Sequence, residues 1–314
     1  MVGGSGTPRV SIVMPIHNGA RYLDAAIASV RAQSSTDWEL ICVDDASTDA
    51  TAAIIARHAG ADERVRLLAN PRNLGLPATL NRGFAAARAP LHSWTSDDNL
   101  LRPSMLRRLV DELDARPEAH VAYASFTVID AAGARLRVQR AGPVDELLLR
   151  NVVGAAFLYR AEVTAALGGY DEALFGAEDY DFWLRAARRF RFAAVDEDLY
   201  LYRRHPASLT DTREREIKAK VAALVLRELQ WVTDRRRRAD ALITLAVNDT
   251  GRLRTGLVAR AALESPAVAV AAAPRVARWL ARASRNRWVE HRARTARATI
   301  GAREKELNIG RTCG

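Results

Sequence analysis

The first hundred residues alternate between short apolar segments and amphipathic segments, and this alternation strongly limits the folds open to the chain. The apolar segments predict strands at residues 9–15, 38–43, 65–69 and 89–94. The segments between them have apolar residues at helical spacing and predict helices at residues 20–32, 50–59 and 77–87. Asn18 is expected to cap the first helix. Strands separated by helices predict an α/β fold, with a mostly parallel central sheet flanked by helices.

Two adjacent carboxylates, Asp97 and Asp98, follow the fourth predicted strand. Ligands of open α/β sheets bind where strands end, and neighbouring like charges are costly there unless a cation or hydrogen-bond donors hold them. One interpretation is a divalent metal site, because carboxylate oxygens are ligands that Mg²⁺ and Mn²⁺ prefer. The alternative is a solvated turn, which an Asp-Asp-Asn sequence favours without any ligand.

Further strands and helices follow, and the pattern becomes helical only beyond about residue 212. Strands are predicted at residues 121–129, 155–159, 192–195 and 199–202, with a hairpin return at 135–138. Helices are predicted at residues 105–113, 145–150 and 161–167, and after residue 178 with Trp183, Leu184 and Ala187 facing the core. We expect a flexible N-terminus at residues 1–8, an α/β domain at 9–212 and a basic α-helical region at 213–314.

Charge is distributed unevenly along the 314 residues, whose formal net charge is +10. Residues 211–314 contain 23 Lys and Arg against 11 Asp and Glu, a net charge of +12, whereas residues 1–210 contain 24 against 26, a net charge of −2. A basic region suggests an anionic partner.

The two cysteines, Cys42 and Cys313, form no disulfide framework and do not have the spacing of a zinc site, which suits a reducing cytosol. No apolar run approaches the roughly 18 residues that predict a transmembrane helix.

Six short motifs occur in order along the first two thirds of the chain. They are Val10-Ser-Ile-Val-Met-Pro-Ile-His-Asn18, Val43-Asp-Asp-Ala-Ser-Thr-Asp49, Asn73-Leu-Gly75 with Asn81, Thr95-Ser-Asp-Asp98, Gly168-Gly-Tyr-Asp-Glu172 and Glu178-Asp179. With these motifs, residues 9–210 resemble bacterial family-2 glycosyltransferases, inverting enzymes that use nucleotide-diphosphate sugars. The resemblance implies the GT-A nucleotide-diphospho-sugar transferase fold, extended here by the C-terminal helical region.

The resemblance implies a site for the donor's base at the end of the second strand. Asp44 matches the family's Asp that accepts a hydrogen bond from uracil or thymine N3–H, a role that suits a carboxylate because it only accepts when ionised. Asp45 is then the turn residue, and Pro15 and Ile16 lie under the base. The alternative is that Asp44 or Asp45 merely caps the following helix.

The family's metal-binding acids match Asp97 and Asp98. By this resemblance, Asp98 binds Mn²⁺ or Mg²⁺ at the diphosphate and Asp97 lies near the ribose or the sugar. The metal stabilises the charge that develops on the leaving diphosphate. His205 lies where some relatives have a His near the metal or diphosphate, although a lone His is also a common structural residue.

Asp179 matches the family's general base, which takes the proton of the acceptor hydroxyl as that oxygen attacks C1 of the sugar. Such a base typically contributes ~10²–10⁴-fold to the rate. The alternative is a structural role, because Glu178, Asp179 and Asp181 all fall at a predicted helix start, where the helix dipole favours acids.

The chain departs from the family at the diphosphate. Many relatives have Arg before the Asn that follows Asn-Leu-Gly, whereas this chain has Leu80 before Asn81. Asn73 and Asn81 remain candidates for donor binding. Arg72 or Arg82 is a candidate for the missing arginine, and Arg203 or Arg204 is a further candidate for phosphate binding.

We expect a metal-dependent inverting glycosyltransferase that moves a sugar from a UDP- or dTDP-sugar to a hydroxyl of a carbohydrate, lipid-linked or small-molecule acceptor. The alternatives are a sugar-nucleotide nucleotidyltransferase, disfavoured because residues 17–20 form no glycine-rich loop, and an inactive basic scaffold protein.

The Arg-rich segment 275–303 has Trp and Leu on one helical face. This composition suits binding to an anionic membrane surface, packing against the rest of the protein, or oligomer formation. No nucleic-acid partner is expected. The expected location is the cytoplasm, with peripheral attachment to the inner face of the membrane left open.

Overall fold

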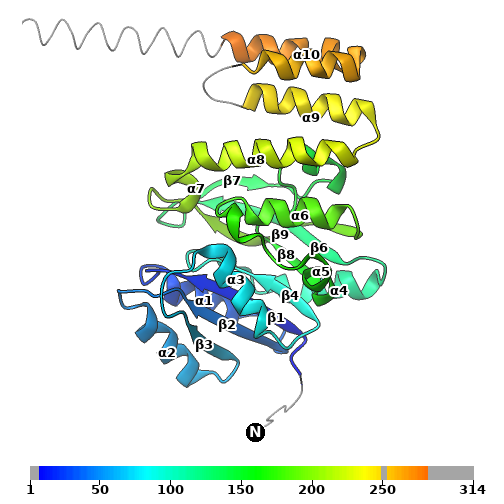
Figure 1. The fold of residues 1–314 in the computed structure, drawn as a ribbon. Helices are drawn as coiled ribbons and strands as arrows, with labels where there is room; N and C mark the ends of the chain where they lie inside the picture. The colour runs from blue at the N-terminus through cyan, green and yellow to red at the C-terminus, as the bar shows by residue number, and fades with distance from the viewer. Residues whose placement is uncertain (1–6, 249–252, 282–314) are drawn as a thin grey trace, which may run out of the picture. The chain divides into compact units, whose positions relative to one another are not determined.

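The structure is a computed structural model that describes residues 7–248 and 253–281 (Figure 1). The chain divides into two compact units, Met1–Leu224 and Val225–Gly314. The division falls inside helix α8 (Glu214–Glu228), past the start of the helical region expected from the sequence.

The described residues of the first unit form a nine-stranded sheet with the order β3-β2-β1-β4-β8-β6-β9-β5, and β7 pairs with β6. The strands are β1 (Val10–Ile16), β2 (Trp38–Asp44), β3 (Val65–Ala69), β4 (Leu91–Trp94), β5 (Leu100–Leu101), β6 (Val121–Ile129), β7 (Arg135–Gln139), β8 (Phe157–Arg160) and β9 (Phe192–Arg203). The four strands β3, β2, β1 and β4 are parallel, as are β6 and β9, while β5, β7 and β8 pair antiparallel with their neighbours. The α/β fold class is therefore confirmed, with a mixed sheet beyond β4.

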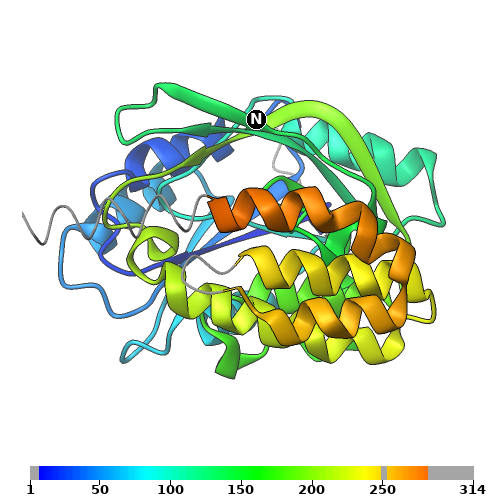
Figure 2. The ribbon, with the colours of Figure 1, turned by 90° about the horizontal axis from the view of Figure 1, so that it is seen from above.

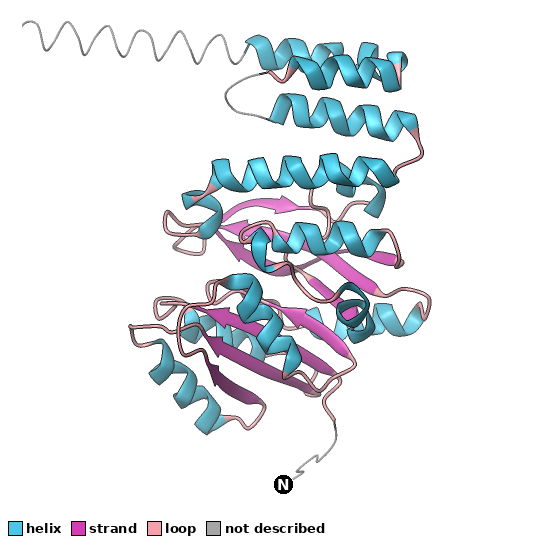
Figure 3. Ribbon diagram, in the orientation of Figure 1, coloured by secondary structure: helices cyan, strands magenta, loops and turns pink. Residues whose placement is uncertain are grey.

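Helices cover both faces of this sheet (Figure 3). Helices α1 (Leu23–Arg31), α2 (Thr51–Ala61) and α4 (Met105–Ala115) share a core with Ile12 and Met14 of β1. On the other face lie α3 (Leu76–Ala85), α5 (Ala161–Leu167) and α6 (Glu178–Ala187). There, Gly83 of α3 lies so close to Val13 that a Cβ atom would collide with it. Because side chains alternate along a strand, β1 supplies buried residues to both layers.

The short helices complete the first unit. They are the 3₁₀ turns η1 (Val144–Leu148) and η2 (Glu172–Leu174), and α7 (Leu209–Thr212). Gly168 ends α5 in a left-handed conformation with a φ of 71°, as the Gly-Gly sequence predicts.

Some local predictions were wrong. Residues 192–203 form the single strand β9, because register shifts against β6 accommodate the polar segment that suggested a break. Asn18 does not cap α1, because its side chain accepts a hydrogen bond from the Thr48 backbone instead. On α6 it is Ala186, and not Ala187, that faces the core.

The second unit is helical throughout its described part. It contains η3 (Leu229–Trp231), α9 (Arg235–Asn248), α10 (Thr255–Glu264) and a further helix over residues 266–281. Helices α9 and α10 lie side by side (Figure 2), and Arg238 of α9 pairs with Glu264 of α10 at 2.6 Å. Within residues 7–248 and 253–281, no helix has the length and apolar character needed to span a bilayer. Cys313 and most of the Arg-rich segment 275–303 lie outside the described residues.

Candidate active site

Two loops at the carboxyl ends of β1 and β2 are bonded to each other. The Asn18 backbone N–H donates to Ser47 Oγ at 2.9 Å, and Asn18 Oδ1 accepts from the Thr48 backbone N–H at 2.8 Å. Asn18 and Ala46 have left-handed backbone conformations, with φ of 54° and 58°. Residues other than glycine adopt this conformation rarely and often near functional sites. The cross-bonded loops therefore form a well-defined edge beside the sheet.

An acidic cavity of about 500 Å³ opens beside these loops. We name it for the carboxylates that line it, Asp45, Asp97 and Asp98. Pro15, Asn73 and His205, which the sequence also marks as site residues, belong to the same wall. Residues from the ends of β1 and β4, from the loop before α3 and from the segment after β9 thus meet around one space.

Asp97 lies against the glycine of the β1–α1 loop. A Cβ atom on Gly19 would collide with the Asp97 carboxylate, so the glycine leaves the space that this side chain occupies. Burial, and secondarily the charge of Asp98, raises the pKa of Asp97 to about 7. Asp97 therefore needs a nearby cation or hydrogen-bond donor to stay ionised at neutral pH.

Asp98 lies against His205. Asp98 Oδ2 is 3.1 Å from His205 Nε2, and the two side chains are 18% and 12% exposed. Asp98 Oδ1 is buried and has no hydrogen-bond partner. Burial raises the pKa of Asp98, and the contact with His205 opposes this rise. A buried carboxylate oxygen without a partner is uncommon and needs an explanation.

A divalent ion provides one explanation. Across residues 7–248 and 253–281, no cluster of three or more His, Cys, Asp and Glu side chains is arranged to hold a metal. Mg²⁺ is commonly held by only one or two carboxylates, with substrate phosphates and waters completing its shell. Asp98 Oδ1 fits such a partial ligand set, because carboxylate oxygens suit both Mg²⁺ and Mn²⁺, and the imidazole of His205 beside Asp98 is the candidate second ligand.

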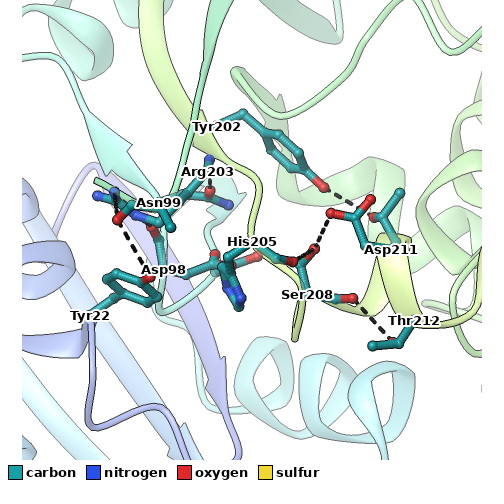
Figure 4. A network of polar contacts seen from close by, with 12 residues as sticks. Tyr22, Asp98, Asn99, Tyr202, Arg203, His205, Ser208, Asp211 and Thr212 are labelled. Atoms are coloured by element: carbon teal, nitrogen blue, oxygen red, sulfur yellow. Dashed lines mark hydrogen bonds and ion pairs between the residues drawn. The ribbon is translucent and has the colours of Figure 1, made fainter. Parts of the chain in front are cut away.

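Arg203, at the end of β9, fixes the backbone around Asp98 (Figure 4). Its Nε donates to the Asp98 carbonyl at 2.9 Å, and its Nη1 donates to the two carbonyls of residues 130–131 in the β6–β7 turn, each at 3.2 Å. Its guanidinium carbon lies 4.6 Å from the ring centroid of Tyr22, and that ring lies 5.2 Å from the ring of His205. Arg203 is 7% exposed, so it acts here as a buried structural link.

A second cavity, of about 470 Å³, adjoins the acidic cavity. We name it the aromatic cavity for the rings that line it, those of Trp94, Phe126, Tyr200 and Tyr202. The two cavities share the wall residues Leu76, Ser96, Asp98, Ser208 and Leu209. Asp98 therefore lies where the two spaces meet.

Asp179 lines the aromatic cavity at the start of α6. Asn151 Nδ2 donates to Asp179 Oδ2 at 3.1 Å, and the Tyr180 backbone N–H donates to Asp179 Oδ1 at 2.6 Å. Burial raises the pKa of Asp179, and these hydrogen bonds oppose the rise. A carboxylate with a raised pKa that faces a cavity is a good proton acceptor near neutral pH.

The other two acids at the start of α6 are engaged elsewhere. Glu178 accepts a hydrogen bond from the Gly176 backbone N–H at 2.6 Å, and burial followed by the charge of Asp179 raises its pKa. Asp181 is buried and pairs with Arg185 at 2.6 Å. Glu178 also lines the aromatic cavity, but Asp179 is the acid that a cavity-lining amide orients.

Aromatic packing holds α6 in place. Trp183 meets Phe157 of β8 edge to face, with centroids 4.8 Å apart, and Phe182 stacks on Tyr170 at 4.5 Å. Such pairs add to the stabilisation that area burial already provides. The position of Asp179 therefore depends on a rigid helix and not on a loop alone.

Asp44 and Asp45 have different surroundings. Asp45 accepts hydrogen bonds from Asn70 Nδ2 and from the backbone N–H groups of Leu74 and Gly75, at 2.7–2.9 Å. It thereby fixes the loop before α3, in keeping with its predicted role as the turn residue. Asp44 is 7% exposed and accepts from the Ser47 backbone N–H at 3.0 Å. Asp45, and not Asp44, is among the residues that line the acidic cavity.

Asn81 lies outside both cavities. Its amide accepts from the Tyr170 backbone N–H at 2.8 Å and donates to the Tyr170 carbonyl at 2.9 Å, which clamps α3 to the segment before α6. With Arg72 and Arg82 it lines a separate surface groove of about 470 Å³, which we call the outer groove. Asn73 lines both the outer groove and the acidic cavity.

The structure therefore gathers six of the eight predicted site residues around the two adjoining cavities, and places Asp44 and Asn81 beside them. Sequence reasoning missed Tyr22, Asn151 and the structural role of Arg203. No local pattern marks these residues, because the site residues that they contact, Asp179, Asp98 and His205, lie 28 or more positions away.

Comparison with known proteins identifies the family. Residues 11–167, half of the chain, match the family model described as Glycosyl transferase family 2. The chain belongs to this family. Its membership confirms the resemblance carried by the six motifs.

This family-2 chain aligns with only part of each of two curated relatives. The O-antigen biosynthesis protein RfbC of Myxococcus xanthus is 33% identical over 182 residues, which are 57% of this chain and 14% of RfbC. The succinoglycan biosynthesis protein ExoO of Rhizobium meliloti (strain 1021) is 34% identical over 158 residues, which are 49% of this chain and 44% of ExoO. The chain thus spans less than half of the length of either relative.

Solved structures share the fold of this family-2 chain at low sequence identity. S. aureus TarS residues 1–349 in complex with UDP-GlcNAc has a TM-score of 0.63 and 15% identity, covering 84% of this chain and 79% of TarS. The mannosyltransferase PcManGT from Pyrobaculum calidifontis, in complex with GDP-Man and Mn²⁺, has a TM-score of 0.55 and 18% identity, covering 91% of this chain and 81% of PcManGT. Together with the family, these neighbours confirm the expected GT-A fold.

Proposed function

We propose that the protein is an inverting, metal-dependent glycosyltransferase that moves a sugar from a UDP- or dTDP-sugar to an acceptor hydroxyl. One observation carries this proposal: Asp98 lies in the wall shared by two cavities, and Asp179 lines the second of them. A donor in the acidic cavity would place its sugar near the shared wall. An acceptor in the aromatic cavity would then lie between that sugar and Asp179.

The donor would occupy the acidic cavity. Pro15, Asn73 and Asp97 line it, and Asp97 is proposed to lie near the ribose or sugar. Asp44, next to the lining residue Asp45, is the proposed acceptor for the base N3–H. Structural neighbours of this chain have been solved with UDP-GlcNAc and with GDP-Man, which supports a nucleotide-sugar donor. The space of about 500 Å³ is within the range of small-molecule sites.

Asp98 and His205 are the residues that would hold Mn²⁺ or Mg²⁺ beside the diphosphate. When bound, such an ion neutralises charge on the leaving nucleoside diphosphate as a Lewis acid. The support from this chain is the buried Asp98 Oδ1, which has no protein partner, and the imidazole 3.1 Å from Oδ2. The Mn²⁺ complex of a structural neighbour supports the choice of metal.

Asp179 is the proposed general base. The acceptor hydroxyl gives its proton to a carboxylate oxygen of Asp179 while its oxygen forms the new bond to C1, and the C1–O bond to the diphosphate breaks on the opposite face. One displacement of this kind inverts the configuration at C1. Asn151 keeps the carboxylate oriented, and burial raises its pKa so that it binds the proton more readily.

The acceptor would enter the aromatic cavity, whose rings provide flat apolar faces for a carbohydrate, a lipid-linked sugar or another hydroxyl-bearing molecule. Relatives named for O-antigen and succinoglycan biosynthesis support a role in polysaccharide assembly.

We further propose a cytoplasmic location with peripheral attachment to anionic lipid, supported by the net charge of +12 over residues 211–314. Self-association through the helical region is the competing role for that segment.

Donor turnover by variants tests the proposal. Wild type is incubated with a panel of nucleotide sugars and Mn²⁺, and release of nucleoside diphosphate is measured with and without oligosaccharide acceptors. We expect Asp98→Ala to abolish release and Asp179→Asn to lower transfer by ~10²–10⁴-fold. Asp179→Asn should still bind UDP with Mn²⁺, because its change lies in the aromatic cavity. Asp111→Asn, an exposed acid on α4, is the matched control.

Each contrary outcome has a distinct meaning. Full turnover in both variants would overturn the site assignment. Release of pyrophosphate from a nucleoside triphosphate and a sugar phosphate would indicate a nucleotidyltransferase. Nucleotide binding without turnover of any donor would indicate an inactive binding protein. Turnover of GDP-sugars alone would move the donor to a guanine nucleotide and leave the roles of Asp98 and Asp179 intact.

A further inference from the structure

We propose that Arg21 is the cation that binds the donor's diphosphate in this chain, which has Leu80 and not an arginine before Asn81 of α3. The inference rests on the proposed function. It assigns a role to a residue that the motifs do not mark, because Arg21 follows the first motif and precedes α1.

The acidic cavity needs such a cation. Asp45, Asp97 and Asp98 line it, and a diphosphate would add further negative charge. One divalent ion offsets only part of this charge. Among the described residues that line this cavity, Arg21 is the only Lys or Arg. Like charges that are brought together out of water are costly without a cation.

The arginines of the α3 region are poorly placed for this role. Arg72 and Arg82 line the outer groove and not the acidic cavity. The Arg82 guanidinium donates to Asn70 Oδ1, which ties it to the loop before α3. Neither arginine of the α3 region therefore lines the acidic cavity.

The arginines after β9 are also committed. Arg203 is 7% exposed and uses Nε and Nη1 to hold three backbone carbonyls, one of which belongs to Asp98. Arg204 forms an ion pair with Asp211 of α7. Neither residue lines the acidic cavity.

Within the described part of the chain, Arg21 combines an unpaired side chain with a position in the wall of the acidic cavity, and none of the other four arginines has both. Its side chain is exposed, and no described Asp or Glu forms an ion pair with it. Its guanidinium carbon lies 4.9 Å from the ring centroid of Tyr22, whose ring lies 5.2 Å from His205. Stacking on an aromatic ring uses the face of a guanidinium and leaves its edge N–H groups available for phosphate oxygens. The Tyr22 ring therefore contacts both Arg21 and His205, and both of these residues line the acidic cavity.

Nucleotide binding tests this role separately from turnover. Binding of UDP, dTDP, GDP and uridine to the full chain with Mn²⁺ is measured by calorimetry for wild type, Arg21→Gln and Arg21→Lys. We expect Arg21→Gln to weaken nucleoside diphosphate binding about tenfold, the size of one charged hydrogen bond, and to leave uridine binding unchanged. Arg21→Lys should recover part of the loss, because it restores the charge without the planar donors.

Two comparison variants make the result specific. Arg107→Gln removes an exposed arginine from α4 and controls for net charge, and Arg72→Gln tests the rival in the outer groove. Equal diphosphate affinity in wild type and Arg21→Gln would overturn the proposal, and so would a loss confined to Arg72→Gln. If wild type binds no nucleoside diphosphate, the proposed function itself fails. If uridine affinity falls as much as UDP affinity, Arg21 acts on the base and not on the diphosphate.

Discussion

Asp97 and Asp98 are neighbours in sequence, yet the fold gives them different surroundings. Asp97 fills the space beside Gly19, where burial raises its pKa to about 7, whereas Asp98 pairs with His205 and keeps one oxygen without a partner. The adjacent carboxylates are therefore not interchangeable. A substitution at Asp98 removes the proposed metal ligand, and a substitution at Asp97 removes a buried negative charge beside it.

Asn151 is predicted to lower the pKa of Asp179 and so to extend catalysis to lower pH. Asp179 must be deprotonated to accept a proton, so the transfer rate falls as the pH drops through its pKa. The hydrogen bond from Asn151 lowers this pKa, against the larger effect of burial, which raises it. Asn151→Ala should therefore move the acidic limb of the kcat/KM profile to higher pH. Profiles of kcat/KM from pH 4 to 9 measure the shift.

Gln139→Ala provides the matched control for this measurement. Gln139 lines the same aromatic cavity, so its truncation changes the cavity without touching the hydrogen bond to Asp179. Its acidic limb should coincide with that of wild type. An unmoved limb for Asn151→Ala would show that Asp179 is not the group whose ionisation limits the rate.

Asp62 is predicted to stabilise the fold above acidic pH. Arg64 and Arg31 donate to its carboxylate and lower its pKa from 3.8 to about 2. The stabilisation is therefore present above about pH 4 and is lost as the pH falls through about 2. The pKa difference sets an upper limit of about 2.5 kcal/mol, and partial exposure of both arginines reduces the expected cost of Asp62→Asn to about 1–2 kcal/mol.

Denaturant unfolding at several pH values measures this cost. The difference between wild type and Asp62→Asn should be largest near pH 6 and should shrink towards zero near pH 2. Asp114→Asn breaks an exposed ion pair with Arg9 and should change the free energy of unfolding by less than about 0.5 kcal/mol throughout. A difference for Asp62→Asn that does not depend on pH would contradict the ionic explanation.

At this scale, sequence reasoning succeeds where a residue's role is tied to a motif and a strand end. Asp98 and Asp179 could be nominated because their motifs occur in order with matching strands and helices, and His205 because some relatives have a His at that place. Arg21 and Asn151 could not, because what distinguishes them is the cavity they line and the side chains they meet. Such contacts exist only once the chain has folded.

Among the elements, α3 borders both cavities. Its N-terminal residue Leu76 lies in the wall shared by the two cavities, and Asn81 clamps it to Tyr170 before α6. Gly169 makes this clamp possible, because its φ of 80° and its lack of a Cβ atom allow the close approach of Asn81 Oδ1. The start of α6, which carries Asp179, is thereby fixed relative to the donor side.

Asn81→Ala is predicted to lower stability more than donor affinity. It removes two hydrogen bonds to the Tyr170 backbone, and we expect the free energy of unfolding to fall by about 1–3 kcal/mol. Thermal or urea unfolding measures this loss, and UDP affinity with Mn²⁺ is measured on the same variant. Arg72→Ala, in the same outer groove, is the control for stability. A large loss of UDP affinity at unchanged stability would return Asn81 to the donor site.

The presence of the strands could be predicted from the sequence more reliably than where a strand continues or how its flanking loops are bonded. The first three strands were found almost residue for residue, because short apolar runs between turns mark strands. Strands β1 and β2 are buried on both faces, whereas the edge strand β3 is only partly buried. The two-residue strand β5 was missed because so short a pairing leaves no periodic pattern. Asn18 was misjudged because a polar side chain before a helix can bond across to another loop as well as to its own helix.

For the whole molecule, the main contrast is between a nearly neutral α/β unit and a basic helical one. Arg235, Arg236 and Arg237 are exposed at the start of α9, and Trp231 and Leu263 are 60% and 77% exposed. The division inside α8 could not be placed from sequence, because a helix gives no compositional signal where its packing partners change. The charge asymmetry, in contrast, was fully visible in the sequence.

The full chain is predicted to bind vesicles that contain anionic lipid. Flotation with phosphatidylglycerol-containing vesicles should recover the protein at low salt and lose most of it at about 0.5 M salt, because surface charges are screened over shorter distances as salt rises. Neutral phosphatidylcholine vesicles are the control and should recover little. A chain ending near residue 270 should bind less. Equal flotation with both lipids, or no effect of truncation, would contradict an electrostatic role for the basic region.

The wall that the two cavities share has a kinetic consequence. Leu76, Ser96 and Asp98 line both cavities, and under the proposed function they would lie between the donor's sugar and the acceptor. An acceptor that arrived first would obstruct the donor's sugar there, whereas a bound donor would complete the floor on which the acceptor rests. We therefore expect a compulsory order, in which the nucleotide sugar binds before the acceptor and the nucleoside diphosphate leaves last. The residues shared by the two cavities would then determine the order of substrate binding and product release.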